Sequence, residues 1–124
     1  MTLQESGQMY LETIYVLSMS SKLVRAIDVG EQMGYSKPSV SRALSRLKSD
    51  GYVVADENGY LSLTDKGLEV ARTIYERHTV LSEVLGLLGV DDKIAAQDAC
   101  RIEHVISRES FDAIKRHLKK HRDN

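Results

Sequence analysis

Apolar residues recur at every third or fourth position over most of the chain, which predicts a mainly helical protein. Caps and breakers divide the pattern: Ser6 and Ser36 are expected N-caps, and Gly34 is expected to end one helix. The predicted helices are 7–19, 24–33, 37 to about 49, one after Thr64 to about Gly86, one that starts at Asp91 or Asp92, and one after Ser107. The basic tail 115–122 is expected to fray.

The third predicted helix has an apolar stripe on one side and a cationic, hydroxyl-rich face on the other. The stripe consists of Val40, Ala43, Leu44 and Leu47, and the opposite face has no acid before Asp50. After a short helix and a tight glycine turn, such a helix is typical of a helix-turn-helix. Arginine can bind guanine in the major groove, and short serines can approach phosphates and base edges. The candidate DNA-binding residues are Lys37, Pro38, Ser39, Ser41, Arg42 and Arg46.

A predicted hairpin follows this helix directly, because β-prone runs at 52–55 and 60–63 flank the turn signal Asn58-Gly59. The order helix, helix, basic helix, hairpin, helix predicts a winged helix-turn-helix DNA-binding domain over residues 1–66. The helices of 67–124 are too few and too apolar for an independent monomer, so we expect them to pack against a second copy. The predicted fold is therefore mainly α with a small β-hairpin: an N-terminal winged helix-turn-helix, then a helical dimerisation domain.

The composition fits a globular, helix-rich protein of 124 residues, with 42% hydrophobic residues, 28% charged residues and one proline. A single cysteine excludes an intrachain disulfide and favours a reducing, cytoplasmic location. The sequence shows neither a signal peptide nor an apolar run of the roughly 20 residues that span a bilayer, so no membrane partner is expected. The net charge of −1 argues against a nucleic-acid binder, but the third helix concentrates positive charge locally.

A thiol, a carboxylate and an imidazole lie close together in the sequence near the C-terminal end. Cys100, Glu103 and His104 are spaced i, i+3 and i+4, so they share one face if this stretch is helical. Such a set of groups can bind a first-row transition metal. This trio is therefore a candidate metal site.

Three residues far away in the sequence could complete that site. Met9 and Glu12 are three positions apart on the first predicted helix, and His78 interrupts the apolar face of the long helix. Each also has an ordinary role: Met9 as core packing, Glu12 as a solvated charge and His78 as a hydrogen-bonded core residue. We expect a metal ion to bring these residues together with the C-terminal trio.

The chain resembles the metal-dependent repressors typified by the diphtheria toxin repressor and the manganese transport regulator (DtxR/MntR). The resemblance rests on Met9-Tyr10-Leu11-Glu12-Thr13-Ile14-Tyr15, Lys37-Pro38-Ser39-Val40-Ser41, Arg77-His78 and Cys100-Arg101-Ile102-Glu103-His104. It implies a winged helix joined to a helical dimerisation domain, with a divalent metal linking the N-terminal helix to the later helices.

The resemblance also assigns metal ligands position by position. Glu103 and His104 match ligands of both branches of the family. Met9 and Cys100 match sulfur positions of the iron branch, whereas Glu12 and His78 match ligands of the manganese branch, so the implied site is a hybrid. Thiolate and thioether favour softer ions, which favours Fe²⁺ first and Mn²⁺ next.

The chain departs from the iron branch in two respects, and a third position bears on the operator. Ser82 and Ala96 replace a Glu and a His of that branch's ancillary site, so an intact ancillary site is not expected. Arg42 occupies a position where the family has a base-facing residue. The chain also ends where the iron branch continues into an SH3-like third domain, so it resembles the shorter manganese regulators.

Together these features predict a metal-activated, sequence-specific transcriptional repressor that controls iron or manganese homeostasis genes. One alternative is a constitutive or small-molecule-responsive winged-helix regulator that no metal controls. An enzyme is disfavoured because the chain lacks a His-Glu-x-x-His motif and a glycine-rich phosphate loop, and nothing marks an oxyanion hole beside Cys100. A further alternative makes Cys100 a redox sensor.

Overall fold

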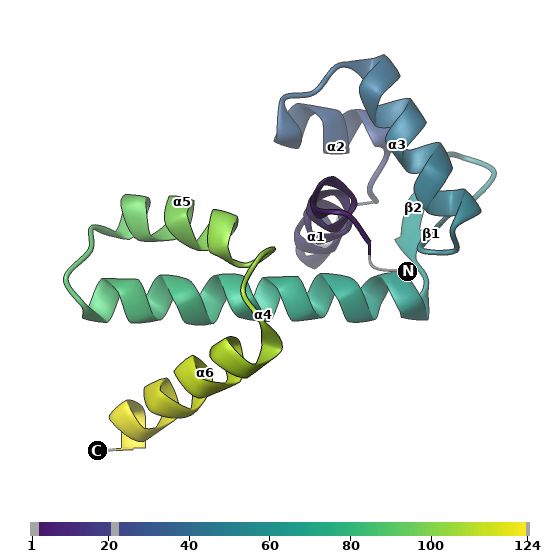
Figure 1. Cartoon of the computed structure of the whole chain (residues 1–124). Coiled ribbons are helices and arrows are strands. Elements are labelled where there is room, and N and C mark those ends of the chain that lie inside the picture. The colour runs from purple at the N-terminus through teal and green to yellow at the C-terminus, as the bar shows by residue number, and fades with distance from the viewer. Residues whose placement is uncertain (1–2, 21–22, 124) are drawn as a thin grey trace. The chain divides into compact units, whose positions relative to one another are not determined.

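A computed structural model describes residues 3–20 and 23–123 and divides the chain into two compact units, residues 1–72 (unit 1) and 73–124 (unit 2) (Figure 1). The elements of unit 1 are α1 (Glu5–Met19), α2 (Ala26–Met33), α3 (Lys37–Ser49), β1 (Val53–Ala55), β2 (Leu61–Leu63) and the start of α4 (Asp65–Leu87). This order is the predicted winged helix, with β1 and β2 antiparallel and Val53 opposite Leu63.

The core of unit 1 lies where α1, α2, α3 and the hairpin meet. Leu11 and Ile14 of α1 are fully buried there. The predicted stripe of α3 is buried at Val40, Leu44 and Leu47, while Ala43 is partly buried beside it. The stripe therefore anchors α3 and leaves its opposite, cationic face on the surface.

Two predicted helix starts of unit 1 are wrong. The N-cap position of α1 is Gln4 rather than Ser6, because the Gln8 N–H already bonds the Gln4 carbonyl at 3.1 Å and closes a helical turn. Helix α2 begins at Ala26 rather than Val24, because the Val24 carbonyl accepts the Leu61 N–H at 2.7 Å and so bonds to strand β2.

The ends of α2, α3 and the hairpin follow local chemistry. Gly34 ends α2 in the left-handed conformation (φ +73°), as predicted. Ser36 caps α3 as predicted, accepting the Ser39 N–H at 3.4 Å. In the hairpin loop 56–60, the Asp56 carboxylate accepts the N–H groups of Asn58 and Tyr60 at 2.8 and 2.9 Å. These interactions define where α2 ends and α3 begins, and they order the loop between β1 and β2.

Unit 2 contains the rest of α4 with α5 (Asp92–Ile102) and α6 (Arg108–Asp123). Its buried core joins Val80 of α4 to Phe111 and Leu118 of α6. Among the described residues 3–20 and 23–123, no helix is long and apolar enough to cross a membrane.

The basic tail does not fray as predicted, because α6 continues to Asp123. Lys115 Nζ bonds Glu76 Oε2 of α4 at 2.8 Å, and Arg122 Nε bonds Glu83 Oε2 of α4 at 2.9 Å. The hydrogen bonds from Arg122 hold the pKa of the Glu83 carboxyl below its ordinary value. Two of the five Lys and Arg side chains of residues 115–122 therefore bond carboxylates of α4.

Candidate metal centre and nucleic-acid interface

The predicted ligand Glu103 lies at the very end of α5, and the predicted ligand His104 lies in the turn that follows. Helix α5 ends at Ile102, and Glu103 is its C-cap residue. His104 lies in the turn that follows. Cys100 remains on the last turn of α5, where it is exposed. The Glu103 N–H still bonds the Ala99 carbonyl at 2.9 Å, so the helical spacing predicted from Cys100 holds at Glu103 and is lost at His104.

The Glu103 carboxylate is held between two imidazoles. Glu103 is fully buried. Its Oε2 lies 2.9 Å from Nδ1 of His78 on α4, and its Oε1 lies 3.3 Å from Nε2 of His104. The His104 side chain is also fully buried, while that of His78 is 29% exposed. Three of the six predicted ligands thus converge within unit 2.

This arrangement fits a divalent transition metal chemically. A buried carboxylate is costly unless hydrogen bonds or a cation compensate its charge. Within the part of the chain that the structure describes, the buried Glu103 Oε1 accepts no well-directed hydrogen bond. One carboxylate and two imidazoles are ligands that Mn²⁺, Fe²⁺ and their neighbours accept.

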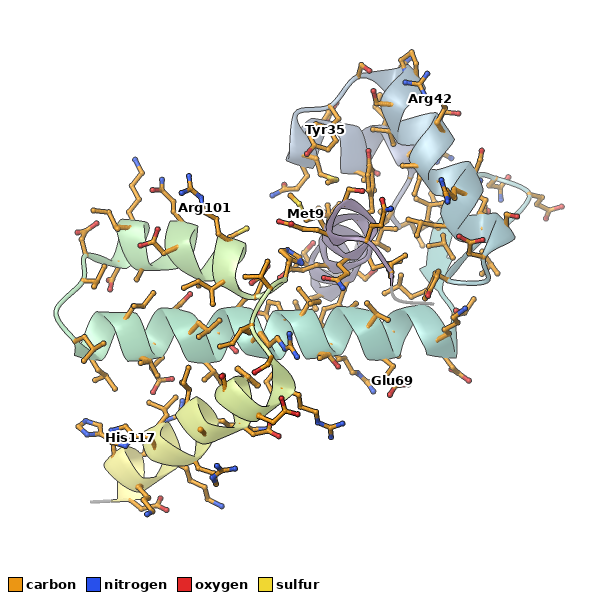
Figure 2. All side chains as sticks on the ribbon, in the orientation of Figure 1. Met9, Tyr35, Arg42, Glu69, Arg101 and His117 are labelled. Carbon is orange, nitrogen blue, oxygen red and sulfur yellow. The ribbon has the colours of Figure 1, made fainter. Side chains whose placement is uncertain are left out.

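Of the remaining three predicted ligands, Cys100 lies on α5 and the other two belong to unit 1. Met9 and Glu12 are half-buried and three positions apart on α1, so they share one flank of that helix. Figure 2 shows Met9 on α1. Compared with Tyr10, Leu11 and Ile14, which are buried in the core of unit 1, Met9 and Glu12 are only half-buried. Their flank is accessible to a polar or metal-binding role.

The predicted DNA-binding face is largely solvent-accessible. Lys37, Pro38, Ser41, Arg42 and Arg46 are exposed, and Figure 2 shows Arg42 projecting from α3. Ser39 differs, because it is half-buried and its Oγ accepts the Ser36 hydroxyl at 3.0 Å. Ser39 thus belongs to the cap of α3 as well as to the predicted interface.

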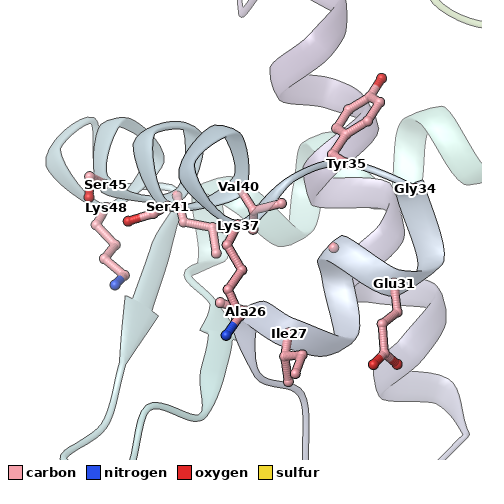
Figure 3. Close-up of a pocket in the computed structure, with 12 residues that line it drawn as sticks. Ala26, Ile27, Glu31, Gly34, Tyr35, Lys37, Val40, Ser41, Ser45 and Lys48 are labelled. Carbon is pink, nitrogen blue, oxygen red and sulfur yellow. The ribbon is translucent and has the colours of Figure 1, made fainter.

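A cleft of about 550 Å³ between α2 and α3 borders this face (Figure 3). Ile27, Val40 and Leu44 give it an apolar floor, while Lys37 and Lys48 supply ammonium groups. Sequence reasoning did not single out Ile27, whose side chain is 51% exposed on α2. Of these apolar side chains Ile27 is exposed, and an exposed apolar side chain suits contact with a thymine methyl group.

Sequence reasoning also missed Arg77 as a residue that contacts the candidate metal centre. Its guanidinium Nη1 donates to the backbone carbonyls of Glu103 and Ile106, at 3.2 and 3.0 Å. The only signal in the sequence was its position immediately before His78, within the pair that carries the family resemblance.

Comparison with known proteins assigns both halves of the chain to one family. Residues 2–61 match the N-terminal DNA-binding domain of iron-dependent repressors, and residues 64–124 match their metal-binding and dimerisation domain. The chain belongs to the iron-dependent repressor family. The transcriptional regulator MntR of Lysinibacillus sphaericus is 32% identical to this repressor over 105 residues, which cover 85% of this chain and 76% of that protein.

Solved structures place this repressor among metal-dependent regulators. The manganese regulator SloR matches 96% of the chain with 25% identity and a TM-score of 0.80. A manganese-dependent transcriptional repressor in complex with manganese matches 91% of it, with 26% identity and a TM-score of 0.83. The chain spans about half the length of these two proteins, 55% and 52%.

These matches confirm the predicted DtxR/MntR relationship and the fold, a winged helix-turn-helix followed by a helical dimerisation domain. They also confirm the class of function, a metal-responsive, DNA-binding transcriptional repressor. The family consists of transcriptional regulators rather than enzymes.

Proposed function

We propose that the chain is a cytoplasmic, homodimeric repressor of iron or manganese homeostasis genes, with a divalent metal as its activator. The observation that carries the proposal is the buried Glu103 carboxylate between His78 and His104. In this proposal residues 1–66 bind the operator, and residues 67–124 supply dimerisation and most of the metal ligands. Operator binding and dimerisation are thus assigned to different parts of the chain.

The proposed metal ligands are Met9, Glu12, His78, Cys100, Glu103 and His104. A divalent cation supplies coordination bonds and a positive charge beside the Glu103 carboxylate. Met9 and Cys100 offer sulfur, which favours Fe²⁺ over Mn²⁺. The carboxylates and imidazoles suit either ion. We propose Fe²⁺ as the first activator and Mn²⁺ as a close second.

The link from metal to DNA is thermodynamic. Met9 and Glu12 belong to unit 1, and the other proposed ligands belong to unit 2. A ligand set drawn from both units restricts how the DNA-binding unit can be placed, so metal and operator promote each other's binding by one coupling free energy. Such couplings are typically about 1–3 kcal/mol, which corresponds to roughly 5–150-fold in affinity.

The proposed homodimer accounts for apolar surface on unit 2. Leu87 and Leu88 at the end of α4, Ile94 on α5 and Val105 after α5 are all more than half exposed, with Leu88 75% and Val105 74% exposed. Large apolar side chains in such numbers favour burial against another protein surface. A dimer with two recognition helices fits operators with two half-sites about one DNA turn apart.

The test of this function compares operator binding with and without metal. We expect affinity for the DNA upstream of the protein's own gene, or of neighbouring metal-transport genes, to rise at least tenfold with Fe²⁺ or Mn²⁺ over chelator. Fluorescence anisotropy under anaerobic conditions at fixed salt measures it, with Zn²⁺ in parallel. Tight binding that ignores every ion would contradict metal control.

That contrary result is the signature of the second candidate, a winged-helix regulator not controlled by metal. The observation in its favour is that Glu103 already has an imidazole partner, the His78 Nδ1 at 2.9 Å, as a purely structural carboxylate would. This candidate predicts less than one metal ion per chain after metal loading, together with unchanged DNA affinity under chelator.

Arg42→Ala should weaken operator binding and relax its specificity at one base pair. The exposed guanidinium of Arg42 suits a bidentate contact with guanine, and losing such a contact costs about 1–3 kcal/mol. Lys37→Ala, expected to remove a phosphate contact, should weaken binding to all sequences equally and reduce its salt dependence. Binding to a library of single-base operator variants distinguishes them, and equal sequence profiles for both variants would contradict the assignment of Arg42.

A further inference from the structure

The turn that carries Glu103 and His104 contains carbonyl groups that need hydrogen-bond donors from outside α5. The last carbonyls of an α-helix lack partners within the helix. After α5 ends, the Ile102 carbonyl accepts the N–H groups of Val105 and Ile106, both at 3.0 Å. The carbonyls of Glu103 and Ile106 are instead bonded by Arg77 Nη1, at 3.2 and 3.0 Å. One side chain of α4 therefore brackets the whole turn.

Arg77 is itself held in place. Its guanidinium carbon lies 5.6 Å from the centre of the Phe111 ring, and Phe111 is buried in the core of unit 2. A guanidinium over an aromatic face is attracted to the ring. A cation near the C-terminal end of α5 also interacts favourably with the dipole of that helix. Arg77 thus connects α4, the turn and α6.

Arg77 and His78, which are consecutive residues of α4, both form hydrogen bonds with Glu103. Arg77 bonds the main-chain carbonyl of Glu103, and His78 bonds its carboxylate. The bond from Arg77 fixes the position of the Glu103 backbone, and the bond with His78 fixes the position of its carboxylate. Both bonds are needed to restrict the backbone and the carboxylate of Glu103 together.

Resting on the proposed function, we propose that Arg77 is a positioning residue of the metal centre. By holding the carbonyls of Glu103 and Ile106, it sets the turn so that the Glu103 carboxylate and the His104 imidazole are in place before a metal binds. Groups that orient metal ligands typically contribute 10–100-fold to metal affinity. Arg77 touches no proposed ligand atom, so it acts only through the turn.

The test measures Mn²⁺ affinity of the full chain by competition with a fluorescent chelator. Arg77→Met keeps an unbranched stem against Phe111 but removes the donors, so affinity should fall about 10–100-fold. Arg77→Lys keeps one charged donor group without the planar fork. Its Mn²⁺ affinity should lie between that of Arg77→Met and that of wild type. Arg72→Met, which alters an exposed arginine of the same helix, is the matched control and should match wild type.

A second readout separates positioning from general stability. In the metal-free protein, hydrogen exchange at the amides of Val105 and Ile106 should accelerate in Arg77→Met, while amides in the middle of α4 keep their wild-type rates. If Arg77→Met does not fold, Arg77→Lys carries both measurements. Wild-type metal affinity in both folded variants, or lost affinity with unchanged exchange in the turn, would overturn the proposal. Failure of wild type itself to bind Mn²⁺ or Fe²⁺ would instead overturn the proposed function.

Discussion

Glu103→Gln should abolish the metal response of operator binding while leaving metal-free binding unchanged. The amide keeps the shape of the carboxylate but loses its charge, and carboxylate charge is what draws a divalent cation to a site with neutral imidazoles. We expect the metal-induced rise in affinity, at least tenfold in wild type, to fall below about twofold, which removes most of a coupling of about 1–3 kcal/mol. Anisotropy titrations with chelator, Mn²⁺ and Fe²⁺ measure it.

The matched control for this variant is Glu109→Gln, which alters an exposed glutamate in the first turn of α6. It should respond to metal as wild type does. His104→Ala tests the same centre from the other side, because its imidazole contacts Glu103 Oε1. If Glu103→Gln and His104→Ala both retain the full metal response, the metal centre does not lie at this turn.

Gly67→Ala should destabilise the protein by about 3 kcal/mol. Gly67 lies in the first turn of α4, directly beneath the backbone of Tyr52. A Cβ added there would overlap the Tyr52 carbonyl oxygen and lie 3.1 Å from its carbon. Overpacking typically costs about 1–3 kcal/mol, and the upper end applies here because backbone cannot rotate away as a side chain can. Thermal unfolding followed by circular dichroism measures the loss.

The control for this prediction is another glycine of the same helix. At Gly86 the nearest atom to an added Cβ would be Asp92 Oδ1, at 3.8 Å, which is an ordinary contact. Gly86→Ala should therefore stabilise the protein by up to about 1 kcal/mol through helix propensity alone. Opposite signs for the two substitutions are expected, and equal effects would show that close approach to Tyr52 is not what requires Gly67.

Periodicity predicted the elements well because each depends on residues near in sequence. The stripe of α3 places Val40, Leu44 and Leu47 in the core, and its cap at Ser36 needs only the hydroxyl three residues before the Ser39 amide. Helix boundaries were less predictable where a distant strand intervened. Nothing near Val24 in the sequence indicates that its carbonyl will bond Leu61 of β2 and delay α2.

The sequence determined the candidate ligand types, the cationic helix and the order of elements, because residue chemistry and spacing alone carry that information. It did not determine how Glu103 and His104 are presented. The end of α5 at Ile102 places them in a turn, and long-range bonds from Arg77 and His78 hold that turn against α4. Pairings between residues about 25 positions apart depend on how helices pack, so only the tertiary structure could decide them.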